Sequence, residues 1–201
     1  MGQPDGPGHP SALDAGDEGL RLFVAVDVPG PQKASVEAAI APLKAVVPGA
    51  RWTSPSIWHV TLRFIGEIAA DRLPAIREGV ERALSGAGPL DSHLLDIGAF
   101  PTMSRARVLW ASIDDPRSTL AGWAERIGRE CGLKEDRPLH PHLTLARLKV
   151  PAAIGPVVDR FRPFELDRTP YPIDKVTLFR SYTERSGPRY EPLKVWSLST
   201  G

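Results

Sequence analysis

The chain has 201 residues, 42% of them hydrophobic and 24% charged, a composition typical of a globular protein. It carries 25 Lys and Arg against 24 Asp and Glu, and this net charge of +1 does not indicate a strongly basic duplex-binding protein. No apolar run approaches the roughly 20 residues of a membrane-spanning helix, and the N-terminus lacks the basic start and apolar segment of a secretory signal. We therefore expect a cytoplasmic protein that makes no membrane contact.

Residues 1–19 are rich in Gly, Pro and Asp and contain almost nothing to bury, so they are predicted to form a disordered acidic tail. Residues 20–201 are predicted to form one domain. The first 20 residues hold four acidic side chains and no basic ones, which leaves 25 basic against 20 acidic side chains, or +5, on the remainder. That surplus suits an anionic ligand.

Strands and helices are predicted in alternation along the domain. The first is a strand over 21–28, and a helix over 32–47 follows, which Pro42 is expected to kink or shorten. The later elements are, in chain order, a strand over 58–65, a helix over 72–84, strands over 94–100 and 107–113, a helix over 120–131 capped by Gly132, a strand over 143–148, and a closing hairpin of 176–182 and 190–198. This order indicates an α+β fold with largely antiparallel sheets.

The single cysteine, Cys131, cannot form an internal disulfide, which fits a reducing cytoplasm. It lies in the apolar-periodic stretch of the third predicted helix. We expect it to be a small core residue and not a nucleophile.

Two His-x-Thr-x tetrads fall within two of the predicted strands, as His59-Val60-Thr61-Leu62 and His142-Leu143-Thr144-Leu145. Side chains on a strand alternate between its faces, so each tetrad presents an imidazole and a hydroxyl on one face and two apolar side chains on the other. Both tetrads follow a Pro-containing approach, over 54–58 and 137–141, which is a faint sign of a duplicated lobe. If the two strands meet, one site holds two imidazoles and two hydroxyls.

Two imidazoles suit proton transfer at a phosphorus centre. In-line displacement needs a base for the nucleophile and an acid for the leaving oxygen on the opposite side, and histidine serves in either role near neutral pH. The hydroxyls of Thr61 and Thr144 are placed to donate to the phosphate oxygens. The pair of tetrads therefore predicts cleavage or formation of a phosphodiester bond, with no cofactor.

A zinc site and a purely structural role are the alternatives. Zinc takes three or four ligands, and neither tetrad offers a third Cys, Asp or Glu at a supporting offset. His140 is a candidate recruit, but Pro141 argues against a regular strand that presents both His140 and His142. No metal is expected, and a single tetrad alone would be read as an ordinary strand residue pair.

Several residues beside the tetrads are candidates for substrate contact. Arg63 lies two beyond Thr61, so on a regular strand it shares the reactive face, where it would contact phosphate. Arg147 has an odd offset from His142, and regular alternation would turn it away. The aromatic side chains of Trp58, Phe64 and Tyr190 are candidates to stack a base, although Phe64, on the apolar face, is expected to pack in the core.

Motifs outside the tetrads extend over nearly the whole domain. They are Arg21-Leu22-Phe23-Val24-Ala25-Val26, the Trp58 to Glu67 run WHVTLRFIGE, Arg105-Ala106-Arg107-Val108-Leu109-Trp110, the Arg137 to Arg147 run RPLHPHLTLAR, and the Arg189 to Trp196 run RYEPLKVW. With these motifs in this order, the chain resembles the 2H phosphoesterases. It is most similar to their RNA 2′,3′-cyclic phosphodiesterase branch, also called 2′–5′ RNA ligases.

The resemblance implies a bilobal α+β fold of two pseudo-symmetric lobes, mainly antiparallel sheet with helices outside, around a central groove that holds one tetrad from each lobe. It also implies hydrolysis of an RNA 2′,3′-cyclic phosphate to a 2′-phosphomonoester, with His59 as proton donor and His142 as proton acceptor. It places an arginine at Arg147. No obligate protein partner is implied. A cyclic nucleotide or ADP-ribose cyclic phosphate substrate, 2′–5′ RNA ligation, and a non-catalytic RNA-end binding module remain alternatives.

Overall fold

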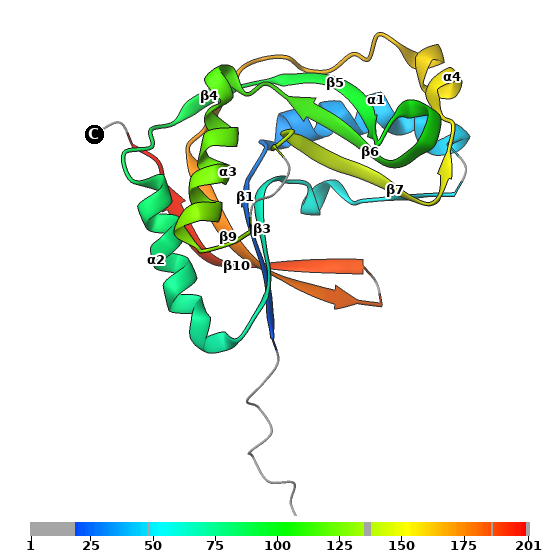
Figure 1. The fold of residues 1–201 in the computed structure, drawn as a ribbon. Helices are drawn as coiled ribbons and strands as arrows, with labels where there is room; N and C mark the ends of the chain where they lie inside the picture. Colours follow the sequence, from blue (N-terminus) through cyan, green and yellow to red (C-terminus); the bar gives the residue numbers. More distant parts are fainter. Residues whose placement is uncertain (1–18, 48, 135–137, 186, 200–201) are drawn as a thin grey trace, which may run out of the picture.

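The computed structural model describes residues 19–47, 49–134, 138–185 and 187–199 (Figure 1). The predicted acidic tail lies almost wholly outside these residues and stays a prediction. The elements, in chain order, are β1 (Leu20–Val26), α1 (Gly30–Val46), β2 (Ala50–Trp52), β3 (Val60–Ile68), α2 (Leu73–Leu84), β4 (Leu90–Ser92), β5 (Leu94–Phe100), β6 (Ala106–Ile113), α3 (Thr119–Glu130), β7 (His142–Ala152), α4 (Gly155–Val158), β8 (Tyr171–Ile173), β9 (Lys175–Glu184) and β10 (Gly187–Ser197).

The main sheet is antiparallel and runs in the order β10-β9-β1-β3-β7-β6-β5, with β2 paired to β7. It divides into two lobes at β3 and β7, which share the single paired position Val60 and Leu143 and then diverge. In Figure 1, α2 and α3 lie beside β1 and β3, whereas α1 and α4 lie beside β5, β6 and β7. The predicted bilobal α+β fold is confirmed.

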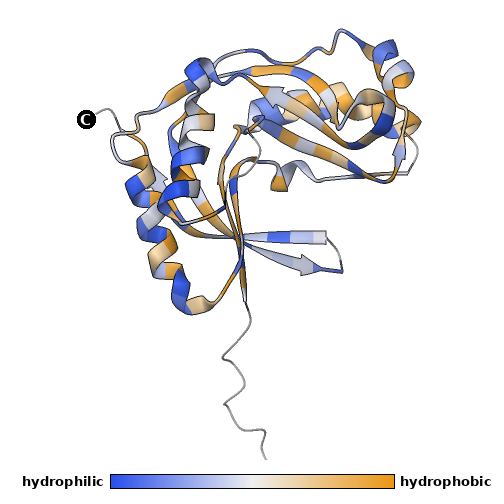
Figure 2. Ribbon diagram, viewed as in Figure 1, coloured by the Kyte–Doolittle hydropathy of each residue, from blue (hydrophilic) through white to orange (hydrophobic). Residues whose placement is uncertain are grey.

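The helices bury the faces that their apolar periodicity marks. On α2 the side chains of Ile76, Val80 and Ala83 are buried, and on α3 those of Leu120 and Ile127 are among the buried set. In Figure 2 the central strands are drawn largely in hydrophobic orange, while the projecting end of the β9–β10 hairpin is pale to blue. The core therefore lies between the sheet and its helices, and the hairpin end extends beyond it.

The helix ends follow local chemistry in two places. Helix α1 continues through Pro42 to Val46, so Pro42 does not shorten it as predicted. Helix α3 ends at the predicted cap: Gly132 has a φ of +64°, and the amide of Leu133 donates to the Gly128 carbonyl at 2.8 Å. Cys131 is buried as predicted, and burial raises the pKa of its thiol to about 11.

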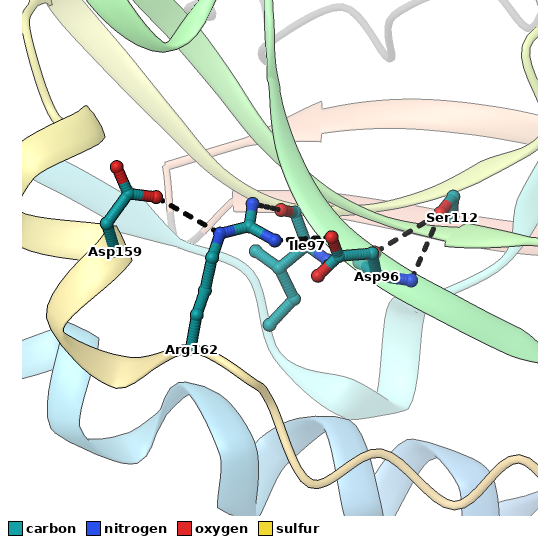
Figure 3. A network of polar contacts seen from close by, with 5 residues as sticks. All are labelled: Asp96, Ile97, Ser112, Asp159 and Arg162. Carbon is teal, nitrogen blue, oxygen red and sulfur yellow. Dashed lines mark hydrogen bonds and ion pairs between the residues drawn. The ribbon is translucent and has the colours of Figure 1, made fainter.

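A polar network anchors the outer edge of the second lobe (Figure 3). The Arg162 guanidinium forms an ion pair with Asp96 and another with Asp159 at 3.2 Å, and it donates to the Ile97 carbonyl at 2.7 Å. Ser112 completes the network by a hydrogen bond to the Asp96 carbonyl at 3.2 Å. Because β5 is the edge of the sheet, Arg162 holds the segment after α4 against an edge that would otherwise be open.

No helix within the described ranges is long and apolar enough to cross a membrane.

Candidate active site

The two tetrads lie side by side because β3 and β7 pair in one register. Val60 is the antiparallel partner of Leu143, and both side chains are fully buried on the helix side of the sheet. The flanking residues therefore project from the opposite face, with His59 next to the position of Thr144 and Thr61 next to that of His142. The sheet thus brings two imidazoles and two hydroxyls onto one face.

Both histidines are oriented by the same backbone contact. His59 Nδ1 lies 2.9 Å from the carbonyl oxygen of Ile57, and His142 Nδ1 lies 2.6 Å from that of His140. A carbonyl oxygen only accepts, so Nδ1 is the protonated nitrogen in each ring. The Nε2 atom is then left to accept or deliver a proton, and in His59 it lies 3.0 Å from the Thr61 hydroxyl.

Aromatic rings surround His59 on the groove side of the first lobe. Phe23 stacks on the imidazole with ring centroids 4.8 Å apart, and Tyr190 meets it edge-on at 5.1 Å. Phe179 extends the stack beyond Phe23 at 5.2 Å. This burial lowers the pKa of His59, since the charged form loses solvation.

His142 has its own set of rings from the second lobe. Phe100 lies edge-on at 5.1 Å, and the rings of Trp110 and His140 lie at 6.4 and 6.3 Å. Trp110 reaches over β5 at Gly98, where an added Cβ would fall 2.3 Å from the indole, so only glycine leaves room for that ring. Burial lowers the pKa of His142 as well.

The charges around the two imidazoles differ. Beside His59, the Lys33 ammonium lowers its pKa and the Asp27 carboxylate raises it, and these two groups form an ion pair at 2.6 Å. Beside His142, His140 and Arg147 both act to lower its pKa. At His59, Lys33 and His142 thus lower the pKa against the effect of Asp27, whereas at His142 both charged neighbours lower the pKa.

A one-residue bulge occurs at the fourth residue of each tetrad. On β3, Ala25 pairs with Thr61 but Val24 pairs with Arg63, so Leu62 is the extra residue. On β7, Trp110 pairs with Thr144 but Leu109 pairs with Ala146, so Leu145 is extra. A bulge of one residue exchanges the faces of the residues that follow it, up to the next irregularity in the register. Residues after each tetrad therefore point opposite to the way regular alternation predicts.

The predicted placement of Arg63 on the face of Thr61 is wrong for this reason. Its guanidinium lies against α3, 3.1 Å from where a Cβ would stand on Gly128, and Nη2 donates to the Lys134 carbonyl. Arg63 thus joins the helix side of the first lobe to α3.

Phe64 takes the outward place instead. Its side chain is 60% exposed, and its ring lies 6.2 Å from that of Phe23, on the side of the sheet that holds His59. The prediction that Phe64 packs in the core is therefore wrong. Trp58, another candidate to stack a base, is 2% exposed and donates from Nε1 to the Thr53 hydroxyl at 2.8 Å, so it belongs to the core.

Arg147 and Tyr190 both border the groove. Arg147 follows the β7 bulge and is exposed, and its charge acts on His142 and on the Tyr190 hydroxyl. Burial is the main cause that raises the pKa of Tyr190, whereas Arg147 and Arg21 lower it. Regular alternation would turn Arg147 away from the site, and the bulge instead turns it toward the site.

Comparison with known proteins identifies the family. The LigT-like phosphoesterase family matches residues 26–110 and 113–190. The chain belongs to this family. The "RNA 2',3'-cyclic phosphodiesterase" of Methanothermobacter thermautotrophicus is 26% identical over 185 residues, which are 89% of this chain and 99% of the relative. The protein of that name from Thermus thermophilus is 30% identical and covers 89% of this chain and 90% of its own.

Solved structures of this family share the fold. Escherichia coli LigT in apo form superposes with a TM-score of 0.73 at 27% identity, covering 90% of this chain and 99% of its own. The resemblance to the 2H phosphoesterases is therefore confirmed for family and fold.

The part of the chain that the structure describes offers no metal site. No group of three or more His, Cys, Asp or Glu side chains there has the geometry to hold a metal ion. His140 stands beside His142, but within those residues no third ligand accompanies the two.

Proposed function

We propose that this LigT-like phosphoesterase hydrolyses the 2′,3′-cyclic phosphate at an RNA end to a 2′-phosphomonoester, without a metal ion. The observation that carries the proposal is the register of β3 and β7, since Val60 opposite Leu143 sets both His-x-Thr pairs on one face of the sheet. The relatives from M. thermautotrophicus, T. thermophilus and E. coli, named as RNA 2′,3′-cyclic phosphodiesterases, support the substrate.

In the proposed reaction His142 Nε2 takes a proton from water, and the water oxygen attacks phosphorus as the P–O3′ bond breaks. His59 Nε2 gives its proton to the departing O3′, and the phosphate remains on O2′. Solvent exchange then returns a proton to His59 and removes one from His142. Water is consumed, and no redox change or cofactor is needed.

The charges around the two histidines support this assignment of roles. A base must be neutral at the start, and His140 and Arg147 favour neutral His142. An acid must be protonated at the start, and Asp27 opposes the effect of Lys33 on His59. A carboxylate thus favours protonated His59 against the effects of Lys33 and His142, whereas both charged neighbours of His142 favour its neutral form.

The remaining groove residues are assigned to binding. The Thr61 and Thr144 hydroxyls and the Arg147 guanidinium donate to the non-bridging phosphate oxygens, whose charge grows in the transition state. Tyr190 and the exposed Phe64 stand on the His59 side, where a base of the terminal nucleotide can stack. Arg63 has no part in this proposal, because its side chain lies against α3.

The test is incubation of the purified protein in EDTA with an RNA that ends in a 2′,3′-cyclic phosphate. We expect a 2′-phosphate end, identified against synthetic 2′- and 3′-phosphate standards. A 3′-phosphate product, or activity that EDTA abolishes, contradicts the proposal. Turnover that survives in both His59→Ala and His142→Ala contradicts the catalytic roles, and binding without turnover in the wild type favours the RNA-end binding module.

A second candidate keeps the site and changes the substrate to a small nucleotide. E. coli LigT, 28% identical to this chain, has a solved structure complexed with 3′-AMP. Rates on the cyclic-phosphate RNA, a nucleoside 2′,3′-cyclic phosphate and ADP-ribose cyclic phosphate separate the candidates. Attack by an RNA 5′-hydroxyl in place of water would give 2′–5′ ligation at the same site, and the same assay detects it as a longer product.

A further inference from the structure

The direction of the proposed reaction places the RNA chain on one side of the groove. In-line attack puts the water and the departing O3′ on opposite sides of phosphorus. Since His142 activates the water and His59 protonates O3′, the terminal ribose lies on the His59 side. The rest of the RNA, joined to that ribose through its 5′ oxygen, then has a path over the first lobe.

The groove face of the first lobe continues from His59 into two charged residues. Val26, the last residue of β1, pairs with Val60, so Asp27, which directly follows it, stands beside His59. Ala25 pairs with Thr177 on β9, and the same register sets Lys175 beside Asp27. Asp27 lies four residues after Phe23, and side chains an even number apart on an extended segment share a face. Because Phe23 contacts the His59 ring, Asp27 also faces the groove. A row of neighbours therefore runs from His59 through Asp27 to Lys175.

A surface hollow lies at the end of this row. It is lined by Asp27, Pro29, Pro172, Ile173, Asp174 and Lys175. We call it the β1–β9 hollow. Lys33 from the first turn of α1 borders it, since its ammonium is bonded to Asp27 at 2.6 Å. The Lys33 side chain is only 16% exposed, which holds the ammonium in place at low further entropic cost.

We propose that the β1–β9 hollow binds the nucleotide that precedes the cyclic-phosphate nucleotide. The Lys33 and Lys175 ammonium groups take the phosphodiester that joins the two nucleotides, and the Asp27 and Asp174 carboxylates accept from the 2′-hydroxyl of the preceding ribose. This proposal rests on the proposed function for the direction of the chain.

The mixture of charges fits a ribonucleotide and not a free anion. Two carboxylates would repel an isolated phosphate, but they are strong acceptors for a sugar hydroxyl. A 2′-hydroxyl is the group that distinguishes RNA from DNA. Because the hollow holds both donors and acceptors, we expect it to favour an RNA oligonucleotide over a mononucleotide.

The test is product binding, measured by calorimetry, because binding does not depend on turnover. The probes are a nucleoside 2′-phosphate and the RNA dinucleotide that ends in the same 2′-phosphate. We expect the dinucleotide to bind about tenfold more tightly to the wild type, and Lys33→Gln with Lys175→Gln to remove that advantage and leave mononucleotide affinity within about twofold. Loss of one phosphate contact should also reduce the slope of log K against log salt by about 0.7.

Lys44→Gln is the matched control. Lys44 is also on α1 and also paired with a carboxylate, Glu37 at 3.4 Å, but it lies 11 residues from Lys33, about 16 Å along the helix. Lys175→Gln alone is the second variant, since Lys33 also acts on the pKa of His59. Thermal unfolding of each variant verifies that it folds.

Three outcomes overturn the proposal: no preference for the dinucleotide in the wild type, equal loss of both ligands in the double variant, or the same loss in Lys44→Gln. A dinucleotide with 2′-deoxyribose only at the first position should lose about three- to tenfold in affinity, and equal binding contradicts the role of the carboxylates. These binding results do not depend on hydrolysis. If the protein binds the dinucleotide as expected but hydrolyses no cyclic-phosphate substrate, the proposed function is contradicted and the assignment of the hollow is not.

Discussion

In both halves of the sheet the tetrad strand has a bulge at its fourth tetrad residue, and the histidine Nδ1 is bonded to the carbonyl two residues before it. In both, aromatic rings from other strands of the sheet contact the imidazole. The His59 half adds the Asp27–Lys33 ion pair, and the His142 half adds His140 and Arg147. The two halves therefore agree in backbone and differ in charge.

That contrast shows how one duplicated scaffold can divide two roles. The Nδ1 contacts leave Nε2 as the atom that exchanges a proton in both rings, so they do not by themselves choose an acid and a base. The charges differ, because a carboxylate, Asp27, raises the pKa of His59 against the effects of Lys33 and His142, whereas His140 and Arg147 both lower the pKa of His142. Substitutions that make the charges around the two histidines alike should weaken the assignment of one acid and one base. Substitutions that remove one imidazole should show which role it has.

Removal of either imidazole should have the largest effect. His59→Gln and His142→Gln should each lower kcat/KM by about 10²–10⁴-fold, since each removes one general catalyst. The wild type should give a bell-shaped pH profile whose maximum lies below pH 7, because burial lowers the pKa of both groups.

The residual pH profiles distinguish the two roles. His59→Gln should lose the fall at high pH, where the acid deprotonates, and His142→Gln the fall at low pH, where the base is protonated. The reverse pattern would exchange the roles. A phosphodiester with a good aryl leaving group needs no general acid, because its leaving oxygen departs without a proton. Such a substrate should therefore restore the activity of His59→Gln more than that of His142→Gln.

The next largest effect should distinguish the two arginines near the tetrads, because only Arg147 is assigned to phosphate binding. Arg147→Ala should lower kcat/KM by about 10- to 100-fold, because it removes a charged donor to phosphate. It should also move the low-pH limb to higher pH, since Arg147 lowers the pKa of His142. Arg63→Ala should leave kcat/KM within about twofold and lower the free energy of unfolding by about 1 kcal/mol, through lost contact with α3. Steady-state kinetics and urea unfolding of both variants measure this, and an Arg63→Ala enzyme as impaired as Arg147→Ala would contradict the bulge argument.

The alternation of apolar residues was enough to predict the long strands and helices, because burial of one face dominates their stability. The strands β2, β4 and β8 were missed. Each has three residues and forms only because a distant strand supplies its partner, as Leu148 does for Ala50. Such pairing leaves no periodic signal in so short a segment.

At the site, the tetrads were visible as candidates because His and Thr two apart on a strand share a face. The bulges were not visible, because Leu62 and Leu145 are ordinary apolar residues and nothing in their type signals an extra residue. Arg63 and Phe64 were misplaced for that one reason. Asp27 and Lys33 were missed because they approach His59 only through the β1–β3 register and the first turn of α1.

The smallest expected effect is on stability, and here the two halves should agree. Both imidazoles have a pKa lowered by burial, so below about pH 6.5 the unfolded chain takes up protons that the folded chain does not. The free energy of unfolding is then greatest above pH 6.5 and falls as pH is lowered, by at most about 1.4 kcal/mol per pH unit for each histidine. Urea unfolding at several pH values between 5 and 7.5 gives the free energy of unfolding as a function of pH. This free energy should fall less steeply with decreasing pH in both His59→Gln and His142→Gln than in the wild type. If only one variant changes this pH dependence, the two imidazoles are not equally buried. The two halves of the sheet would then differ at the histidines themselves.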